Sequence, residues 1–332
     1  MKKTLLYAAL LGVLAAAAPF TVLLLPAGTP SAGDTPQATP APTVEVPALT
    51  PPPLAASPAA DADAAAALTL YDDAVGQTIT VPVEEFLLGA AACELPPDWP
   101  DDAILAQMVA SHSYALSLGE EPMEVNSALC AGWTDAQVLR ARWGDAYGEN
   151  YARLEALARE VSGALLCYDG APAAACYHSI SAGHTEASQN VWLTALPYLQ
   201  GVDSPWDKTV SDYEVSITYS AEQMASLLQG LGLTPGEDPA QWFGEVQWDE
   251  AGYVDTMEVC GTAFRGTTLR SALSLRSASF TVDYRGDAFT LTTRGYGHGV
   301  GLSQYGARAM AEGGADWREI LAYYFPGCQI TE

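Results

Sequence analysis

The sequence predicts an α+β fold for most of the chain, behind an apolar amino-terminal run and a proline-rich segment. Helical stretches interleave with hairpins, without a regular strand-helix alternation and without an internal repeat. No glycine pattern of the Walker or dinucleotide type opens a helix after a strand, so the sequence indicates no nucleotide cofactor. We therefore expect a single domain of mixed helices and antiparallel sheet.

The amino terminus begins Met1-Lys2-Lys3 and continues as an uninterrupted apolar run over residues 4–25. A helix of that length, at about 1.5 Å rise per residue, crosses a hydrocarbon core of about 30 Å, and the lysines favour a cytoplasmic start. A cleaved signal peptide is the alternative, because the AAAAP stretch offers small residues, but the apolar run continues past it. We expect residues 1–25 to form a single-pass membrane anchor with the rest of the chain outside the cytoplasm.

Residues 26–67 are dominated by proline, alanine and threonine. Such a composition cannot build a packed core and favours extended polyproline II structure, so this segment is predicted to be a disordered linker. The folded domain is then expected over residues 68–332.

The chain carries a formal net charge of −26, from 14 Lys and Arg against 40 Asp and Glu. A polyanion such as DNA or RNA would be repelled by this charge, which excludes nucleic acid as a partner class.

Six cysteines lie in the predicted domain, and export would permit disulfides among them. Six cysteines allow 15 complete pairings in principle. No spacing selects one of them. A two-residue turn at Asp169-Gly170 would place Cys167 opposite Pro172, so a Cys167–Cys176 pair stays open.

The first half of the domain reads as a strand followed by helices. Residues 77–100 begin with strand-like alternation and pass into a short apolar helix that carries Glu94 and ends at Pro96-Pro97. Residues 101–119 begin with two acidic residues, end at a glycine and predict an amphipathic helix. A further helix is predicted within residues 145–163.

The second half is richer in strands. Residues 164–188 read as a hairpin followed by a loop of small residues, and residues 209–292 as a mixed region in which strands dominate. Helices return after the glycine-rich stretch GYGHGVG, residues 295–301.

Glu94 is the first candidate catalytic residue, because apolar residues flank it in the stretch AAACELPP. A carboxylic acid in apolar surroundings loses solvation of its charged form and stays protonated nearer neutral pH, as a general acid requires. A solvent-facing glutamate at a helix end is the alternative.

Three of the four histidines, His178, His184 and His298, lie in polar or glycine-rich loops. A three-histidine zinc site is one hypothesis, although no pair has the helical i, i+4 spacing. For His298 the flanking glycines would allow a ligand to approach the backbone closely, and a tight turn with an incidental histidine is the alternative.

Four stretches, in order, resemble the stage II sporulation protein D family, the SpoIID/LytB domain. They cover residues 90–116, 177–207, 267–282 and 295–330, so the resemblance extends over most of residues 75–330. It implies a SpoIID-type α+β domain with a glycan-binding groove. The implied activity is that of a membrane-anchored lytic transglycosylase, which cleaves peptide-stripped peptidoglycan glycan strands during forespore engulfment beside a partner amidase.

Carried over residue by residue, the resemblance makes Glu94 the catalytic glutamate. Glu94 would protonate the glycosidic oxygen and then accept the proton of the muramic acid C6 hydroxyl, giving a 1,6-anhydro end. The resemblance also implies that Ser181, His298, Gln304 and Tyr305 line the groove.

The chain departs from the family pattern at two places. Many members bind zinc through a His/Cys cluster of which residues 120–133 retain only Cys130, so no metal or other cofactor is expected. The family usually has arginine at the position of His112, and the charge and the planar guanidinium group of that side chain are lost here.

A role also attached to this family, as a non-catalytic wall-binding enhancer of an amidase, is the rival hypothesis.

Overall fold

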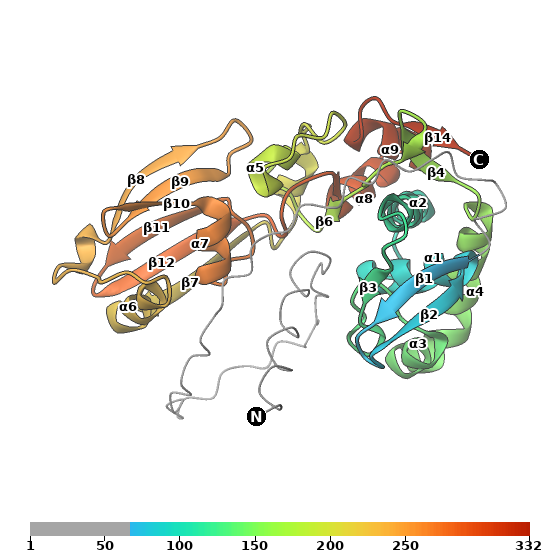
Figure 1. Cartoon of the computed structure of the whole chain (residues 1–332), viewed down its shortest axis with the longest axis horizontal. Coiled ribbons are helices and arrows are strands. Elements are labelled where there is room, and N and C mark those ends of the chain that lie inside the picture. Colours follow the sequence, from blue (N-terminus) through green and yellow to red (C-terminus); the bar gives the residue numbers. More distant parts are fainter. Residues whose placement is uncertain (1–66) are drawn as a thin grey trace, which may run out of the picture.

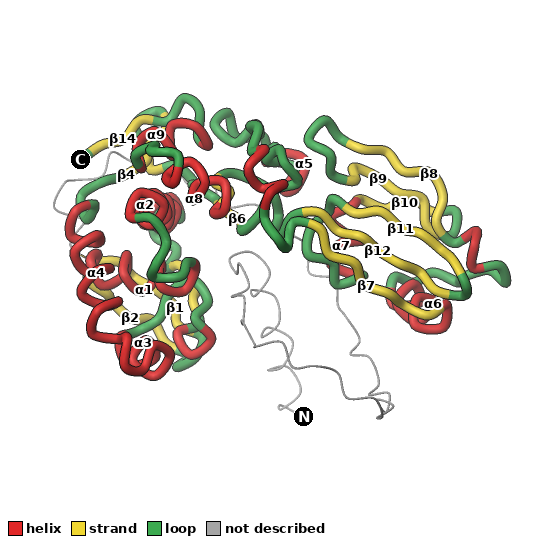
Figure 2. Tube along the Cα trace, turned by 180° about the vertical axis from the view of Figure 1, so that it is seen from behind, coloured by secondary structure: helices red, strands yellow, loops and turns green. Residues whose placement is uncertain are grey.

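The computed structural model describes residues 67–332, which form an elongated molecule built around two hydrophobic cores (Figures 1 and 2). The predicted anchor and nearly all of the predicted linker lie outside the described residues. Within residues 67–332, no helix is both long and apolar enough to cross a membrane.

The larger core holds together the segments on both sides of residues 214–294, and we call this part the large lobe. Its strands form the sheets β2-β1-β3 and β14-β4-β5 and the pair β13-β6. Its helices are α1 (Val83–Glu94), α2 (Asp101–Ser117), α3 (Ala136–Trp143), α4 (Tyr147–Glu160), α5 (Ser188–Trp192), α8 (Gln304–Glu312) and α9 (Trp317–Tyr324). Its strands are β1 (Ala67–Asp72), β2 (Gln77–Pro82), β3 (Met123–Val125), β4 (Leu165–Tyr168), β5 (Ala171–Pro172), β6 (Tyr177–His178), β13 (Leu302–Ser303) and β14 (Gln329–Thr331).

Helix α2 lies at the centre of the large lobe, packed against α1, α4, α8, α9 and β4. The predicted amphipathic helix is therefore buried on nearly every side. Small and hydroxyl side chains, including Ala106, Ala110 and Ser111, allow neighbouring elements to approach it from several directions. Its two acidic first-turn residues suit the positive end of the helix dipole.

Residues 214–294 form the small lobe around the second core. Two three-stranded antiparallel sheets, β11-β12-β7 and β10-β9-β8, enclose this core together with two helices. The elements are β7 (Glu214–Ser220), α6 (Ala221–Gly230), β8 (Phe243–Trp248), β9 (Val254–Val259), β10 (Thr262–Arg265), α7 (Gly266–Ala272), β11 (Phe280–Arg285) and β12 (Ala288–Arg294). The lobe begins and ends at one place, because Glu214 and Arg294 are strand partners joined by a 3.2 Å ion pair.

The α+β class is confirmed, and most strand pairs are antiparallel as predicted. Two pairs are parallel, β1 with β3 and β6 with β13, and each joins segments separated by other elements of the chain. The turn at Asp169-Gly170 places Cys167 opposite Pro172, as predicted. All six cysteines are free thiols in the structure.

Candidate active site

Glu94 is the last residue of α1, where the helix ends because Leu95 adopts an extended backbone with φ −124° and ψ 147°. The residue is half-buried. Its Oε2 accepts a hydrogen bond of 3.3 Å from Nε2 of Gln304, the first residue of α8. Its Oε1 is buried and receives no hydrogen bond from any described residue. One carboxyl oxygen is therefore fixed by Gln304, and the other is a buried acceptor without a hydrogen-bonding partner among the described residues.

The carboxyl group of Glu94 has a pKa well above the ordinary value for glutamate. Burial is the main cause, and the hydrogen bond from Gln304 opposes it in part. The nearby thiol group of Cys130 raises this pKa further when it is charged. Because the neutral form is favoured, Glu94 can hold a proton under conditions in which an exposed glutamate has lost it.

Gln304 is itself held in place by a chain of buried amide and hydroxyl groups. Its Nε2 also donates to Oε1 of Gln107, at 3.2 Å, and Nε2 of Gln107 donates to Oγ of Ser111, at 3.1 Å. Gln107 and Ser111 lie one turn apart on the central helix α2 and are fully buried. The orientation of the Glu94 carboxyl is thus set through the buried central helix of the large lobe.

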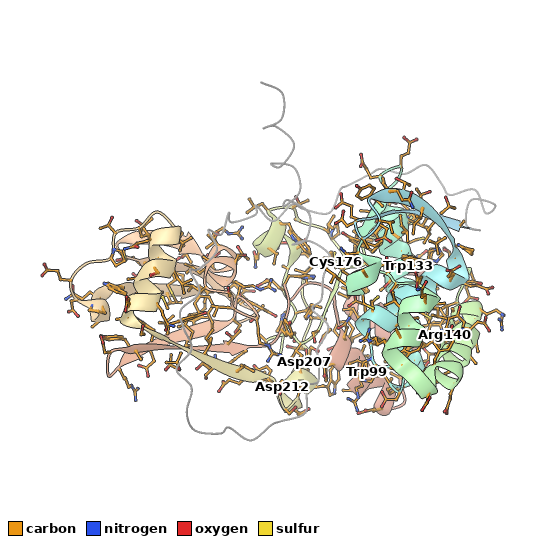
Figure 3. The ribbon with its side chains drawn as sticks, turned by 90° about the horizontal axis from the view of Figure 1, so that it is seen from below. Trp99, Trp133, Arg140, Cys176, Asp207 and Asp212 are labelled. Atoms are coloured by element: carbon orange, nitrogen blue, oxygen red, sulfur yellow. The ribbon has the colours of Figure 1, made fainter. Side chains whose placement is uncertain are left out.

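Asp207, which is labelled in Figure 3, also holds the start of α8 through hydrogen bonds to its carboxylate. This fully buried carboxylate accepts hydrogen bonds from the backbone N–H of Ser181 (3.0 Å), the hydroxyl of Ser181 (2.5 Å) and the hydroxyl of Ser303 (2.9 Å). Ser303 is the N-cap of α8 and its hydroxyl also accepts from Gly306. Ser181 is therefore 0% exposed inside this network and has no hydrogen bond to Glu94 in the described structure. It positions α8, and its predicted place in the groove stays a prediction.

Tyr305 follows Gln304 and packs edge-on against Trp99, with ring centroids 5.0 Å apart. The guanidinium group of Arg308, one turn further along α8, lies 5.2 Å from the same indole ring. Trp99 belongs to the segment that follows Glu94, so Gln304 and Tyr305 both contact the end of α1 or the turn after it. Half-buried Tyr305 offers an aromatic face of the kind that packs against sugar rings.

Sequence reasoning missed three residues beside Glu94: Gln107, Tyr177 and Cys130. Tyr177 of β6 lies close enough that its own pKa is raised first by burial and then by the charge of Glu94. Gln107 carried a signal, because it is an amide in an otherwise apolar and small-residue stretch of the predicted helix. The other two reach the site only through tertiary folding, and no local pattern marks them.

Comparison with known proteins identifies relatives that extend over both lobes. A family model described as "Stage II sporulation protein" (SpoIID) matches residues 71–168, which include Glu94. Stage II sporulation protein D of Bacillus subtilis (strain 168) is 32% identical over 275 residues, covering 80% of this chain and 79% of the relative. The protein of the same name from Bacillus amyloliquefaciens is 33% identical over 266 residues, covering 76% and 75%.

The chain belongs to the stage II sporulation protein D family. A more distant relative, named "Amidase enhancer", also comes from Bacillus subtilis (strain 168). It is 25% identical over 300 residues, which cover 74% of this chain and 40% of the relative.

One departure of this SpoIID-family chain concerns His112, which replaces the arginine expected from the resemblance. Both ring nitrogens of His112 are buried without a hydrogen-bonding partner of good geometry. Burial lowers its pKa to about 4, against a smaller opposing contribution from the backbone of Ala164. His112 is therefore a neutral packing residue of α2 at physiological pH.

The glycine-rich stretch of this SpoIID-family chain allows one backbone to lie directly on another. Gly301 has φ +74°, and a Cβ there would overlap the carbonyl oxygen of Cys176. At Gly297, with φ +118°, a Cβ would lie 2.7 Å from Cβ of His178. The glycines thus let residues 295–301 pack along the segment that contains β6, and β13 then pairs with β6.

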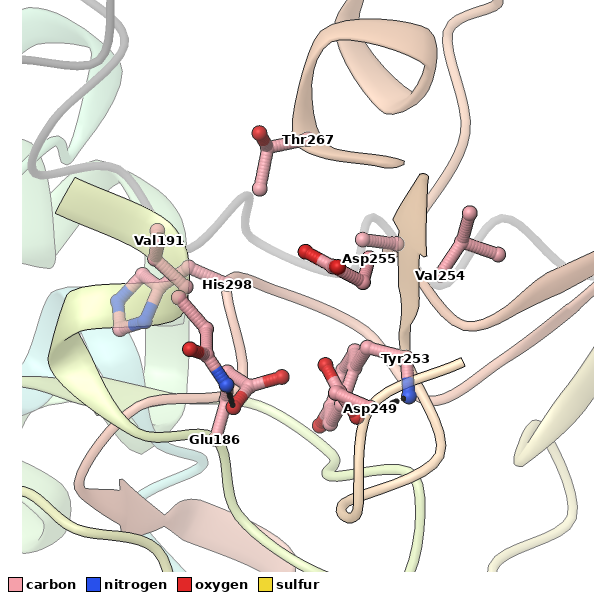
Figure 4. A pocket seen from close by; sticks show the side chains of 10 residues that line it. Glu186, Val191, Asp249, Tyr253, Val254, Asp255, Thr267 and His298 are labelled. Carbon is pink, nitrogen blue, oxygen red and sulfur yellow. Dashed lines mark hydrogen bonds between the residues drawn. The ribbon is translucent and has the colours of Figure 1, made fainter. Parts of the chain in front are cut away.

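His298 lies within this stretch but lines a different pocket, at the junction of the two lobes (Figure 4). Its Nδ1 accepts from the N–H of Val300 at 3.1 Å, and its ring centroid is 5.1 Å from that of Trp192. Burial holds its pKa well below the ordinary value, and the charges of His178 and Arg270 add to the effect. No hydrogen bond joins His298 to Glu94 in the described structure, so its predicted role in the same groove stays a prediction.

The junction pocket contains a pair of carboxyl groups, Glu186 and Asp249, which face each other in Figure 4. Burial raises the pKa of Glu186 to about 8, and its hydrogen bond and charge interaction with Asp249 add to this.

Among residues 67–332, no three His, Cys, Asp or Glu side chains lie together in a way that could hold a metal ion. His178 and His298 are neighbours, with ring centroids 5.7 Å apart, whereas Nδ1 of His184 lies 2.7 Å from the carbonyl oxygen of Thr185.

Proposed function

We propose that this SpoIID-family chain is a lytic transglycosylase that cleaves peptidoglycan glycan strands and leaves 1,6-anhydro-muramic acid ends. The observation that carries the proposal is the Glu94 carboxyl group, with its raised pKa, one oxygen fixed by Gln304 and the other without a hydrogen bond. A group of this kind can donate a proton to a leaving oxygen and accept one afterwards.

In the proposed reaction, protonated Glu94 donates its proton to the glycosidic oxygen as the bond from C1 to that oxygen breaks. The Glu94 carboxylate then accepts the proton of the C6 hydroxyl of the same muramic acid, and the C6 oxygen closes onto C1. The sugar supplies its own nucleophile, so one carboxyl group serves both proton transfers. A hydrolase that uses water needs a second carboxylate, whereas the groups found around Glu94 are an amide, a thiol and a phenol.

Glycan strands already stripped of stem peptides are the proposed substrate, which implies a partner amidase that removes the peptides. The names of the relatives support a place for the chain in sporulation, and we propose the engulfment of the forespore. Residues 4–25 are proposed to anchor the chain in the cell membrane, with residues 67–332 on the outer side of that membrane.

The test is to incubate the full chain with peptide-free glycan strands and to analyse the new chain ends by mass spectrometry. We expect anhydro ends from the wild type and none from Glu94→Gln, which keeps the shape of the side chain but cannot carry the proton. Glu85→Gln is the matched control, because Glu85 is an exposed residue of the same helix. Reducing ends would mean that water is the nucleophile and would refute the transglycosylase proposal.

A second candidate function is supported by the relative named "Amidase enhancer". In this case the chain would bind wall glycan and stimulate an amidase without cleaving the glycan itself. Stimulation of amidase turnover that persists in Glu94→Gln, together with an absence of new glycan ends from the wild type, would favour this candidate.

A further inference from the structure

Arg308 lies on helix α8, one turn beyond the amide that holds Glu94. Residues spaced by four share one face of a helix, so Arg308 follows Gln304 along the face that meets the end of α1. Nε2 of Gln304 donates to Glu94 at 3.3 Å, and the guanidinium carbon of Arg308 lies 5.2 Å from the centre of the Trp99 indole ring. A cationic side chain is therefore placed one helical turn from the residue that orients the proposed acid.

Two other arginines approach the same end of α1, and both are held by the backbone. Nη1 of Arg142 donates to the carbonyl oxygen of Ala92 at 3.1 Å. Arg153 donates through Nη1 to the carbonyl oxygen of Pro97 and through Nη2 to that of Trp99. These two guanidinium groups are engaged in holding the end of α1 and the turn that follows it.

Arg308 differs, because its terminal nitrogens have no such partner. Its Nε donates to Oε1 of Glu312 at 2.8 Å, in an i, i+4 ion pair on the surface of α8. Within residues 67–332, neither Nη1 nor Nη2 of Arg308 donates a hydrogen bond, and 41% of the side chain is exposed to solvent. The edge of the guanidinium group that can bind both oxygens of a carboxylate is thus open.

Arg308 and Tyr305 both pack on the indole ring of Trp99, which is only 6% exposed. A guanidinium group that stacks on an aromatic ring keeps the N–H groups in its plane for a ligand. The ion pair with Glu312 is exposed and contributes little, so it does not prevent Arg308 from binding a second carboxylate. The surface next to Glu94 therefore combines an aromatic ring with an anion-binding group.

The proposed substrate carries an anion of this kind. An amidase that removes a stem peptide hydrolyses the amide between the peptide and the lactyl group of muramic acid, and it leaves a carboxylate on that sugar. A stripped strand is therefore a polyanion, which the formal net charge of −26 on the chain would repel. Binding of such a strand needs a local cation, whereas a strand with its peptides presents a neutral amide at the same place.

We infer that Arg308 binds the lactyl carboxylate of a muramic acid in the strand held at Glu94, and so selects glycan from which the peptide has been removed. The inference rests on the proposed function, because it takes stripped glycan as the substrate. Arg308 is thereby a specificity-determining residue and takes part in neither proton transfer.

The experiment compares two kinds of strand that differ only at this carboxylate. Peptide-free strands are labelled at the reducing end with a fluorophore, and half of them are converted to the lactyl methylamide by carbodiimide coupling to methylamine. Binding to the full chain is measured by fluorescence polarisation in a Glu94→Gln background, which the proposed reaction predicts to be inactive. The salt concentration is about 0.15 M, where charges further apart than about 8 Å are largely screened. We expect the carboxylate strands to bind about tenfold more tightly than the amide strands.

Variants in the same background assign this preference to one side chain. Arg308→Gln should lose the preference, with little change for the amide strands, and Arg308→Lys should keep part of it because the charge remains. Arg318→Gln is the matched control and should keep the full preference. Arg318 is likewise stacked on a tryptophan, Trp317, at 4.1 Å and paired with a glutamate, Glu332, but it lies on α9.

Glu312→Gln tests the same contact without removing Arg308. It frees Nε of Arg308 and removes a competing negative charge, so the carboxylate strands should bind more tightly while binding of the amide strands stays the same. A preference that survives in Arg308→Gln, or a Glu94→Gln chain that binds both strands equally or binds neither, would overturn the inference.

The proposed function is tested separately by the anhydro ends that the wild type forms. Anhydro ends together with equal binding of both strands would refute the role of Arg308 alone. A preference for the carboxylate strands that depends on Arg308, without anhydro ends from the wild type, would support that role and refute the transglycosylase activity.

Discussion

The Asp207 carboxylate accepts a hydrogen bond of 2.9 Å from the hydroxyl of Ser303, the residue that caps α8 immediately before Gln304. The side chain that orients Glu94 therefore starts from a helix end whose position is set by a buried charge in another segment. Ser181, which donates to the same carboxylate through its backbone and its hydroxyl, reinforces this arrangement.

We predict that Asp207→Asn destabilises the chain and slows turnover. An asparagine keeps the shape but has one acceptor oxygen in place of two, so a buried donor loses its partner at a cost of about 2 kcal/mol. Asp212→Asn is the control, because Asp212 is exposed and lies nearby in sequence (Figure 3). Chemical denaturation and glycan-end formation measure the two effects, and equal behaviour of both variants would contradict the role assigned to Asp207.

Gln304→Ala is expected to lower turnover about fivefold, because the loss of one net hydrogen bond of about 1 kcal/mol frees the Glu94 carboxyl to adopt unproductive orientations. The hydrogen bond from Gln304 also holds down the pKa of Glu94, so its removal should shift the alkaline limb of the pH profile to higher pH. A reduced rate with an unmoved limb would mean that Gln304 acts on something other than Glu94.

The raised pKa of Glu94 makes both the activity and the stability of the wild type depend on pH. Proton donation requires the protonated form, so activity should persist to a pH well above the ordinary glutamate range and fall as Glu94 ionises. The folded pKa lies above the unfolded one, so the Glu94 carboxyl makes folding less favourable as pH rises between the two values.

Glu94→Gln removes that ionisation, and it should therefore unfold at a higher temperature than the wild type at neutral and alkaline pH. The difference should shrink near pH 4, where both forms are uncharged. Calorimetric scans across pH check this prediction. A variant that is less stable than the wild type at every pH would count against a desolvated Glu94 in the folded chain.

Gly301→Ala is predicted to cost at least about 2 kcal/mol of stability, because the residue has a positive φ and its Cβ would overlap the backbone of Cys176. Gly286→Ala provides the comparison: Gly286 also has a positive φ, +58°, but nothing lies within 4 Å of the added carbon. We expect the second variant to lose only about 1 kcal/mol. Equal losses in thermal or chemical denaturation would show that conformation alone, and not contact with the backbone of Cys176, explains the glycine.

Local patterns were enough to predict α1, α2 and the turn at Asp169-Gly170, because apolar spacing, prolines and the Asp-Gly pair act over a few residues. They also singled out Glu94 as a carboxyl group in apolar surroundings. The contact with Gln304 came from family resemblance, since Glu94 and Gln304 are 210 residues apart and no local signal joins them.

What the sequence did not predict depends on tertiary contacts. The separate core of the small lobe was not anticipated, because residues 209–292 read as strands whose partners cannot be chosen from alternation alone. Local patterns also did not predict that His298 lines the pocket at the lobe junction or that the Ser181 hydroxyl bonds to buried Asp207. Both positions follow from how the glycine-rich stretch packs on the segment before it.

The small lobe also sets the order in which the site is completed during protein synthesis. Glu94 leaves the ribosome long before residues 214–294 are made, whereas Gln304 follows them. Because Glu214 and Arg294 meet as strand partners, the finished small lobe returns the chain to the place from which it departed. A nascent or prematurely terminated chain therefore carries the acid without the amide that orients it, and the paired site forms only once translation is nearly over.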